Sequence, residues 1–544
     1  MQGCRQAGSG SDDEPKPIAR RCARWGAFAA ALACMAVAEV ALAQKWAFSA
    51  SAGANATYNH SSGANQPQDG FIACLTSSLG IHGGEGGRFT LNGTLGASQL
   101  LCTGPGQGNS FAPNVSLAAH LEAIEKFFFI DATANVSESF ITPLGPQPAN
   151  LTVPTNNRYI SQAYSVSPYI QGVIAPTISY SLRDDNVWTP SASYGNSSAT
   201  TPTTYYNSLN GQMSSVVGHG GGWTLQYSRQ SYDNGVDTGT NVIQVARAIG
   251  SYAVDPQLTL SLRGGYQRDR FPAVSGGDGE LPASQTDQGI IYGAGIDWRP
   301  TERTSLNGYW EHQFFGSSYN WQASHRLPNI ALSANFTRGL STFPQIALQI
   351  PGGVTVAQFL DAAFTTRIPD PAARAQAVAQ FLAQSGLPPI LISPLNFYSP
   401  QTTLQQSASL SAVWIGKLNA IGFTVFKTKN EEIAGTISGL PDVFQLAASS
   451  TQTGCGVNYS HRLSGFTNFI ATATYARTTP NGSDESATNA RTNNFNTSIG
   501  LSTQFTPKTS GSVGLSYFAF DTPGASTVGS QSTVSLYASI LHTF

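Results

Sequence analysis

Few residues of this 544-residue chain have the spacing that catalytic chemistry requires. His219-Gly220-Gly221-Gly222 matches the oxyanion-hole element of some esterases. The G-x-S-x-G elbow, which would carry the nucleophile of such an enzyme, is absent from the sequence. We therefore expect a glycine turn at this position rather than an active site.

Candidate metal and carboxylate sites are equally weak. Gly276 to Glu280 could offer oxygens to calcium, but one acidic glycine loop is more often a plain loop. Asp184-Asp185 and Glu431-Glu432 are adjacent pairs, whose members would face opposite sides of a strand, and we expect them to be solvated loop charges. The histidines show no metal-ligand spacing. The sequence predicts no enzyme activity, cofactor or metal, although a barrel enzyme assembled from distant strands stays an alternative.

The composition indicates the class of protein to which a chain without a recognisable catalytic site belongs. Only 11% of the residues are charged, against about 25% in a typical soluble protein, whereas 41% are hydrophobic. No mature segment approaches the roughly 18 consecutive apolar residues of a membrane helix. The net charge is −2, and without clustered Lys and Arg this argues against a nucleic-acid partner. A sheet protein with one face in lipid fits these values.

The N-terminus predicts secretion. Arg20, Arg21 and Arg24 form a basic region, an apolar stretch follows, and Ala41-Leu42-Ala43 provides a cleavage site. Residues 1–43 are therefore expected to be a signal peptide with an N-terminal extension, and residues 44–544 to be the mature domain. Of the cysteines left, Cys74 and Cys102 flank one predicted hairpin, and their pairing stays open.

From Trp46 onward apolar residues alternate with small polar ones, which is typical of strands with one apolar face. Tight turns alternate with long polar connections, as in transmembrane β-barrels with short periplasmic turns and long outer loops. We expect an all-β fold, a single antiparallel barrel of about 22 strands (an even number between about 16 and 24) in the bacterial outer membrane. The residues expected to face a polar lumen are Thr224, Gln226, Thr259, Ser261, Arg263, Gln267, Gly293, Gly295, Asp297, Ser512, Gly514 and Ser516.

The last residues resemble the terminal strand of bacterial outer-membrane barrels, which the insertion machinery recognises. An alternating face ends on a terminal aromatic residue and consists of Val534, Leu536, Ala538, Ile540, His542 and Phe544. Only a closed barrel lets strands cross lipid without unpaired backbone groups. The sequence therefore predicts outer-membrane lipid and the insertion machinery as partners.

One segment, residues 354–388, departs from strand periodicity. Apolar residues recur there at helical spacing, Asp370 can cap a helix with Pro371 at its first position, and Gly386 can end it. The residues expected to define this helical insertion are Phe359, Leu360, Asp370, Pro371, Val378, Phe381, Leu382 and Gly386. Two interpretations stay open, a helical pair on the outer rim, which we favour, and a plug folded into the lumen.

Short motifs connect the chain to a family. They are Ser167-Pro168-Tyr169, the segment from Gly222 to Gln230, His325-Arg326-Leu327-Pro328-Asn329, and the helical insertion followed by Gln401 to Lys427. In this order they resemble the outer-membrane barrels associated with PEP-CTERM/exosortase and exopolysaccharide loci. The resemblance implies a role in exopolysaccharide production or export, with the glycan and periplasmic export components as partners. The alternative is a surface barrel whose outer loops bind extracellular matrix.

Overall fold

The computed structural model describes most of the chain from Trp46 to the C-terminus. The described ranges are 46–63, 69–84, 87–102, 110–193, 200–215, 220–235, 240–271, 285–348, 402–433, 449–481, 491–523 and 530–544, with isolated positions between 349 and 401. The expected signal peptide (1–43) and the loop from Gly276 to Glu280 lie outside the described residues.

The described chain forms 22 strands. They are β1 (Trp46–Gly63), β2 (Gly70–Gly83), β3 (Phe89–Cys102), β4 (Ser110–Ile124), β5 (Phe128–Phe140), β6 (Arg158–Ala175), β7 (Ile178–Thr189), β8 (Thr204–Ser215), β9 (Gly222–Asp233), β10 (Thr240–Asp255), β11 (Leu258–Phe271), β12 (Gln285–Thr301), β13 (Thr304–Gln313), β14 (Gly316–Arg326), β15 (Ile330–Ser341), β16 (Thr403–Ile415), β17 (Asn419–Glu432), β18 (Ser450–Arg462), β19 (Thr467–Pro480), β20 (Thr492–Thr506), β21 (Thr509–Asp521) and β22 (Gln531–Thr543). A short helix, α2 (Phe343–Leu348), follows β15.

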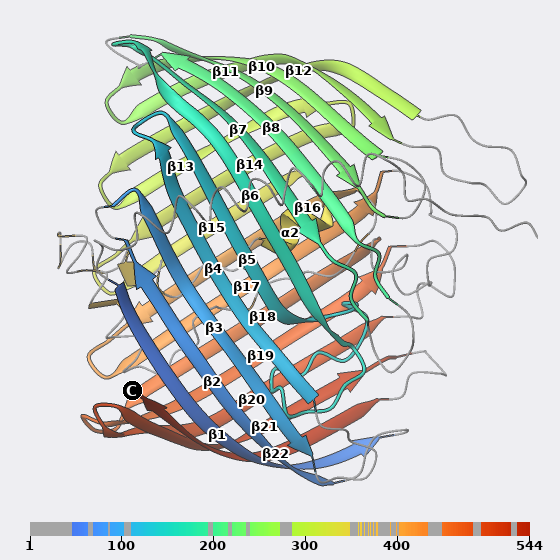
Figure 1. Ribbon diagram of the computed structural model, residues 1–544, viewed down its shortest axis with the longest axis vertical. Helices are drawn as coiled ribbons and strands as arrows, with labels where there is room; N and C mark the ends of the chain where they lie inside the picture. Colours follow the sequence, from blue (N-terminus) through green and yellow to red (C-terminus); the bar gives the residue numbers. More distant parts are fainter. Residues whose placement is uncertain are drawn as a thin grey trace, which may run out of the picture.

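Every strand pairs antiparallel with its neighbours in sequence, and β1 also pairs with β22. The closing pair runs from Ser51 opposite Thr543 to Gly63 opposite Gln531, so the sheet has no free edge (Figure 1). Closure supplies every spanning strand with backbone hydrogen bonds on both sides, which lipid cannot provide. The expected antiparallel barrel of about 22 strands is confirmed.

The two ends of the barrel differ in their connections, as Figure 1 shows. One end, the turn side, carries short turns such as 255–258 and 506–509, together with the start of β1 and the end of β22. The other end, the loop side, carries the long connections. One loop-side connection breaks the expected alternation, because only Phe314 and Phe315 join β13 to β14. Short turns are typical of the periplasmic end of a bacterial barrel.

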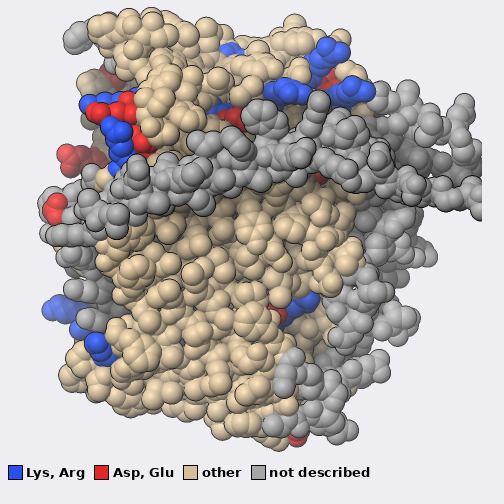
Figure 2. Space-filling view, viewed as in Figure 1, with Lys and Arg blue, Asp and Glu red and all other residues tan. Residues whose placement is uncertain are grey.

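The outer surface is apolar over its middle. Leu262, Ile290 and Leu536 are 74%, 71% and 53% exposed, which would be costly in water but suits contact with lipid chains. Figure 2 shows a broad area without charged side chains, with Lys, Arg, Asp and Glu gathered towards its margins. A closed barrel with this surface is an outer-membrane protein. Among the described residues, no helix is long and apolar enough to span a bilayer.

Both adjacent acidic pairs lie within strands, and both cysteines of the β2–β3 hairpin are thiols. Asp184 and Asp185 are not loop charges, since they lie within β7 with side-chain partners of their own. Glu431 and Glu432 likewise end β17. Cys74 and Cys102 remain thiols; Cys74 lies opposite Leu100, so the two cysteines are diagonal neighbours across β2 and β3.

Candidate functional site

The inner surface of the barrel is lined by short polar side chains. Hydroxyl groups of neighbouring strands meet in cross-strand pairs with O···O distances of 2.6 to 3.1 Å, including Thr133/Ser165, Ser179/Ser214, Ser411/Thr424, Thr472/Ser498 and Ser512/Ser539. Such pairs satisfy each other without a charge. The structure places all twelve expected lumen residues on the inward faces of β9, β11, β12 and β21, where they alternate with exposed outward residues such as Leu225, Leu262, Tyr292 and Leu515.

One group of charges on the inner wall is paired across strands. Glu311 on β13 is fully buried, and its carboxylate oxygens lie 3.1 Å from Arg247 and 3.2 Å from Arg263. Arg263, Gly293 and Glu311 occupy one row across β11, β12 and β13. A Cβ at Gly293 would come within 2.9 Å of Glu311 Cγ, so glycine leaves the space through which the two side chains meet. We call Arg247, Arg263 and Glu311 the ion cluster.

A second charged group lies on β4 to β7. Arg183 donates to Asp131 at 2.6 Å and to Asp185 at 2.7 Å, and its guanidinium lies 4.9 Å from the centre of the Tyr169 ring. His120 contacts the other Asp131 oxygen at 2.7 Å. Each carboxylate of this group therefore contacts Arg183 on the inner wall. At the loop-side rim, the hydrogen bond with His60 lowers the pKa of the Asp69 carboxyl.

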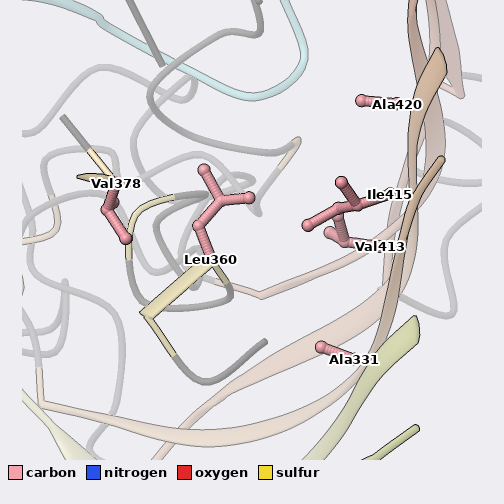
Figure 3. Close-up of a cluster of buried hydrophobic side chains, with 6 residues drawn as sticks. All are labelled: Ala331, Leu360, Val378, Val413, Ile415 and Ala420. Atoms are coloured by element: carbon pink, nitrogen blue, oxygen red, sulfur yellow. The ribbon is translucent and has the colours of Figure 1, made fainter. Parts of the chain in front are cut away.

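Described residues of the segment between β15 and β16, residues 342–402, lie inside the lumen; we call this segment the insertion. Its described residues Leu360 and Val378 pack against Val413, Ile415 and Ala331, which lie on the inward faces of β15 and β16 near the turn side (Figure 3). Ala420 on β17 completes this contact. Because both ends of the insertion start at the loop side, the chain must pass most of the barrel length to reach these residues.

The two ends of the insertion touch other parts of the wall. Gln345 in α2 donates to the Tyr206 hydroxyl on β8 at 2.6 Å. Near the return, the Ser399 carbonyl accepts from Tyr232 on β9 at 3.3 Å, and Thr402 contacts Asn241 on β10 at 3.1 Å. These strands are at least six places away from β16 around the sheet. The described ends of the insertion therefore connect β15 and β16 with a distant part of the wall.

The favoured rim interpretation of residues 354–388 is wrong for the described part of this segment, and the plug interpretation fits it. The reason is the buried cluster on the inner wall, which offers Leu360 and Val378 an apolar surface. The Asp370 carbonyl accepts the Arg374 N–H at 3.0 Å, and Arg374 contacts Asp361 at 2.6 Å. Phe359, Pro371, Phe381, Leu382 and Gly386 lie outside the residues whose side chains are described.

A second segment, residues 141–157 between β5 and β6, also folds inward; we call it the inward loop. Two asparagines on the inward face of β20 bind its backbone. Asn494 accepts from Gln147 N at 2.9 Å and donates to Gly145 O at 3.3 Å. Asn496 accepts from Ala149 N at 2.8 Å and donates to Gln147 O at 3.1 Å. The four bonds imitate a strand ladder and hold the loop across the lumen.

The far end of the inward loop is fixed by apolar and polar contacts. Val153 packs with Phe518 and Phe520 on β21, and Asn59 on β1 donates to Thr152 O at 2.6 Å. The sequence predicts that long connections are outer loops, whereas this long connection lies inside the lumen. Phe518 and Phe520 on the inward face of β21 could have indicated this position, because apolar side chains on a polar inward face are expected where another segment covers them.

A pocket of about 420 Å³ remains between the inward loop and the wall. Its lining has no charged residue and includes Asn55, Thr76, Ser98, Asn150, Thr152, Thr472, Thr474, Asn496, Ser498, Ser516 and Tyr537. Beside it, Asn59 Oδ1, Thr152 Oγ1 and Ser535 Oγ are buried with no hydrogen-bond partner among the described residues. The site combines hydroxyl and amide groups with aromatic surface, the chemistry that suits a neutral ligand rich in hydroxyl groups.

We expect the asparagine contacts to control the position of the inward loop. Replacing Asn494 and Asn496 by Ala removes four hydrogen bonds at about 1 kcal/mol each, so the backbone amides of Gln147 and Ala149 should exchange at least about tenfold faster. Hydrogen–deuterium exchange with mass spectrometry measures this rate. Asn493→Ala is the matched control, because Asn493 lies on the opposite face of β20 and accepts from Tyr475. Equal acceleration in the control would contradict the assignment.

The terminal strand β22 presents its expected residues outward. Val534, Leu536 and Ile540 are exposed on the lipid side together with Ala538. His542 contacts Thr509 on β21 at 2.9 Å, and its ring packs edge-on to Phe544. Recognition of this face by the insertion machinery stays a prediction. Among the described residues, no group of three or more His, Cys, Asp or Glu could hold a metal ion.

Comparisons with known proteins return structural neighbours alone. No protein-family model and no curated protein matches the chain. Solved structures that resemble it include the ferric-catecholate import receptor Fiu of E. coli K12 in its open form, with 9% identity, 91% of this chain and 81% of that chain covered, and a TM-score of 0.44. The FrpB iron transporter of Neisseria meningitidis has 10% identity, coverages of 91% and 81%, and a TM-score of 0.44. The ferric preacinetobactin receptor BauA of Acinetobacter baumannii has 10% identity, coverages of 92% and 81%, and a TM-score of 0.42. On its own geometry, the chain is a 22-stranded outer-membrane β-barrel with two of its own segments folded into the lumen.

Proposed function

We propose that the protein is an outer-membrane conduit for neutral, hydroxyl-rich polymers, with exopolysaccharide as the transported substrate, and that the insertion is its plug. The observation that carries this proposal is the uncharged pocket between the inward loop and the wall of β1 to β3 and β19 to β22. A lumen built for ions or for charged metabolites would present unpaired charges to its cargo.

The energetics of the lining suit a moving polymer. Each hydrogen bond between a sugar hydroxyl and a Ser, Thr or Asn side chain contributes only about 0.5 to 1.5 kcal/mol net, because it replaces a hydrogen bond to water. A ladder of similar hydroxyl pairs continues along the wall, as at Thr472/Ser498 and Ser512/Ser539. A chain leaving one set of groups therefore meets equivalent groups, so no deep trap forms.

The resemblance to barrels of exopolysaccharide loci supports the choice of cargo. A conduit in the outer membrane needs a periplasmic supplier, so we propose periplasmic export components as partners on the turn side. We propose transport of the polymer without a chemical reaction.

Secretion of polysaccharide by a deletion strain tests the proposal. The strain should release less extracellular polysaccharide, and the wild-type gene should restore it. A gene with Thr474→Trp should not restore secretion, because the indole would fill the pocket that Thr474 lines. Ala473→Trp is the control, because Ala473 is the neighbour of Thr474 on β19 and faces the opposite side. Wild-type secretion by the deletion strain would rule out the conduit.

A further inference from the structure

Three arginines stand on the outer surface of the barrel, on the lipid side of β9 and β11. On β9 the outward residues run Trp223, Leu225, Tyr227 and then Arg229, all of them exposed. On β11 they run Leu260, Leu262, Gly264, Tyr266 and then Arg268 and Arg270, with both arginines exposed. Each strand thus changes from apolar to aromatic to cationic towards the loop side.

The strand register places these side chains in rows. Tyr227 and Tyr266 both lie opposite Ala246 of β10 and so share one level. Arg229 and Arg268 both lie opposite Gln244, one row nearer to the loop side. Arg270 follows in the next row. The step from one row to the next is about 7 Å along the strand, and the backbones of Arg229 and Arg268 are about 10 Å apart. We call Arg229, Arg268 and Arg270 the arginine row.

The level of the arginine row follows from its aromatic neighbours. Tyr side chains of a barrel gather where the hydrocarbon meets the headgroups. Arg at the bilayer midplane costs about 2 to 4 kcal/mol, whereas near the interface the cost falls to about 0 to 1. The arginines come directly after the tyrosines on the loop side, which places them at the headgroups of the outer leaflet. Figure 2 shows Lys and Arg gathered in this region, over the loop-side ends of β9 to β12.

The charges of the arginine row are not neutralised by direct contact within the described part of the protein. None of the three guanidinium groups forms an ion pair with a described residue. The carboxylates nearest in register, Asp184 and Asp233, accept from the neutral groups Asn207 Nδ2 at 2.7 Å and Gly235 N at 3.0 Å, and the register sets them about 10 Å or more from Arg229. In the ion cluster, by contrast, Arg247 and Arg263 both contact the carboxylate of Glu311.

We propose that the arginine row binds the phosphate groups of a phosphorylated glycolipid in the outer leaflet. A guanidinium fork matches two phosphate oxygens, which makes Arg better suited than Lys to this contact. Gln244 and Gln288, which lie in the same row, add neutral donors between the cations. The spacing of Arg229 and Arg268 allows contacts with two phosphates of one headgroup. The site lies outside the lumen and is independent of the transported substrate.

Binding of lipopolysaccharide to the purified full-length barrel tests this proposal. The barrel is placed in phosphatidylcholine nanodiscs, lipopolysaccharide is titrated in, and native mass spectrometry counts the bound molecules. The triple variant Arg229→Gln, Arg268→Gln, Arg270→Gln should bind on the order of 100-fold more weakly, at about 1 kcal/mol for each basic residue. The corresponding Arg→Lys triple should keep part of the affinity. Lipopolysaccharide stripped of its phosphates should bind the wild-type barrel as weakly as the Gln triple binds the intact lipid.

The control variant removes the same charge from the opposite end. Arg303→Gln, Lys417→Gln and Lys508→Gln change three exposed cations in turn-side turns. This variant should bind lipopolysaccharide as the wild type does. An equal loss of lipopolysaccharide affinity in both triple variants would show that net charge alone causes the effect, and this would overturn the proposal. Competition by inorganic phosphate at equal concentration would instead assign the row to a soluble anion. Heat-modifiable gel mobility checks that each variant is folded.

Discussion

Replacing residues 342–402 by Asn-Gly should raise the single-channel conductance of the purified barrel on the order of tenfold, because the insertion occupies the lumen. Planar bilayer recording measures this conductance. In the wild-type protein the path of ions is obstructed by the described contacts of Leu360 and Val378 with the inner wall, and by the bridges from Gln345 and Thr402 to β8 and β10.

The register makes this replacement feasible without a change in the barrel. Ser341 lies opposite Thr403, the last and first residues of β15 and β16, so a two-residue turn can join them directly. Asn-Gly favours the turn type that matches the twist of such a hairpin. The barrel should therefore close as before, with the ladder from Ile330/Trp414 to Ser341/Thr403 intact.

A point variant tests how much of the effect on conductance depends on docking of the insertion against the wall, as opposed to its presence in the chain. Leu360→Asp puts a carboxylate against Val413 and Ile415, where it has no partner, and should release the insertion from the wall. We expect a fluctuating, intermediate conductance and faster proteolysis within 342–402. Leu418→Asp, which puts the same carboxylate at an exposed position of a turn-side turn, should retain the wild-type conductance. An unchanged conductance after complete removal of the insertion would show that another part of the chain closes the lumen.

Replacing Glu311 by Ala should destabilise the barrel by about 3 to 5 kcal/mol, the usual cost of removing one partner from a buried ion pair. Glu311 is the only carboxylate that contacts Arg247 and Arg263 among the described residues, and both arginines are about four-fifths buried. Its loss leaves two cations on a low-dielectric wall. Urea unfolding in detergent or lipid, followed by tryptophan fluorescence, gives the change in free energy of unfolding.

Two comparisons show whether the ion cluster causes this loss. In a Glu311→Ala barrel, adding Arg247→Met and Arg263→Met should recover much of the stability, because the buried charges leave together. Arg299→Ala should cost at most about 1 kcal/mol, since Arg299 and Asp297 form an exposed pair. A loss in Glu311→Ala no greater than that in Arg299→Ala would contradict a buried network.

The outer wall of the barrel follows from the sequence alone. Alternation along segments such as Leu258 to Arg268 separates the apolar face from the polar face, and turn chemistry marks the ends of the strands. Each strand must pair on both sides in lipid, so a closed barrel is the one arrangement that fits. For this reason the strand number, the membrane location and the direction of residues such as Thr259 and Ser261 could be predicted.

The contents of the lumen could not be predicted in the same way. Alternation reports that a face is buried or polar but does not report what covers it. At Val413-Trp414-Ile415 both faces are apolar, which indicates cover on the inner side as well, but the sequence does not name the covering segment. The structure supplies it, since Leu360 and Val378 meet these residues from a loop that starts at the other end of the barrel.

What the sequence determined by itself is therefore local: strand, turn and the two faces of each strand. What the tertiary structure decided are the contacts between residues hundreds of positions apart, such as Asn494 with Gln147 and Glu311 with Arg247. The low charge of the chain reflects its lipid-facing surface, because a charged side chain in the hydrocarbon layer costs free energy on any strand. The position of the inward loop and of the insertion depends instead on which distant side chains complement each other, and only the closed barrel brings those side chains together.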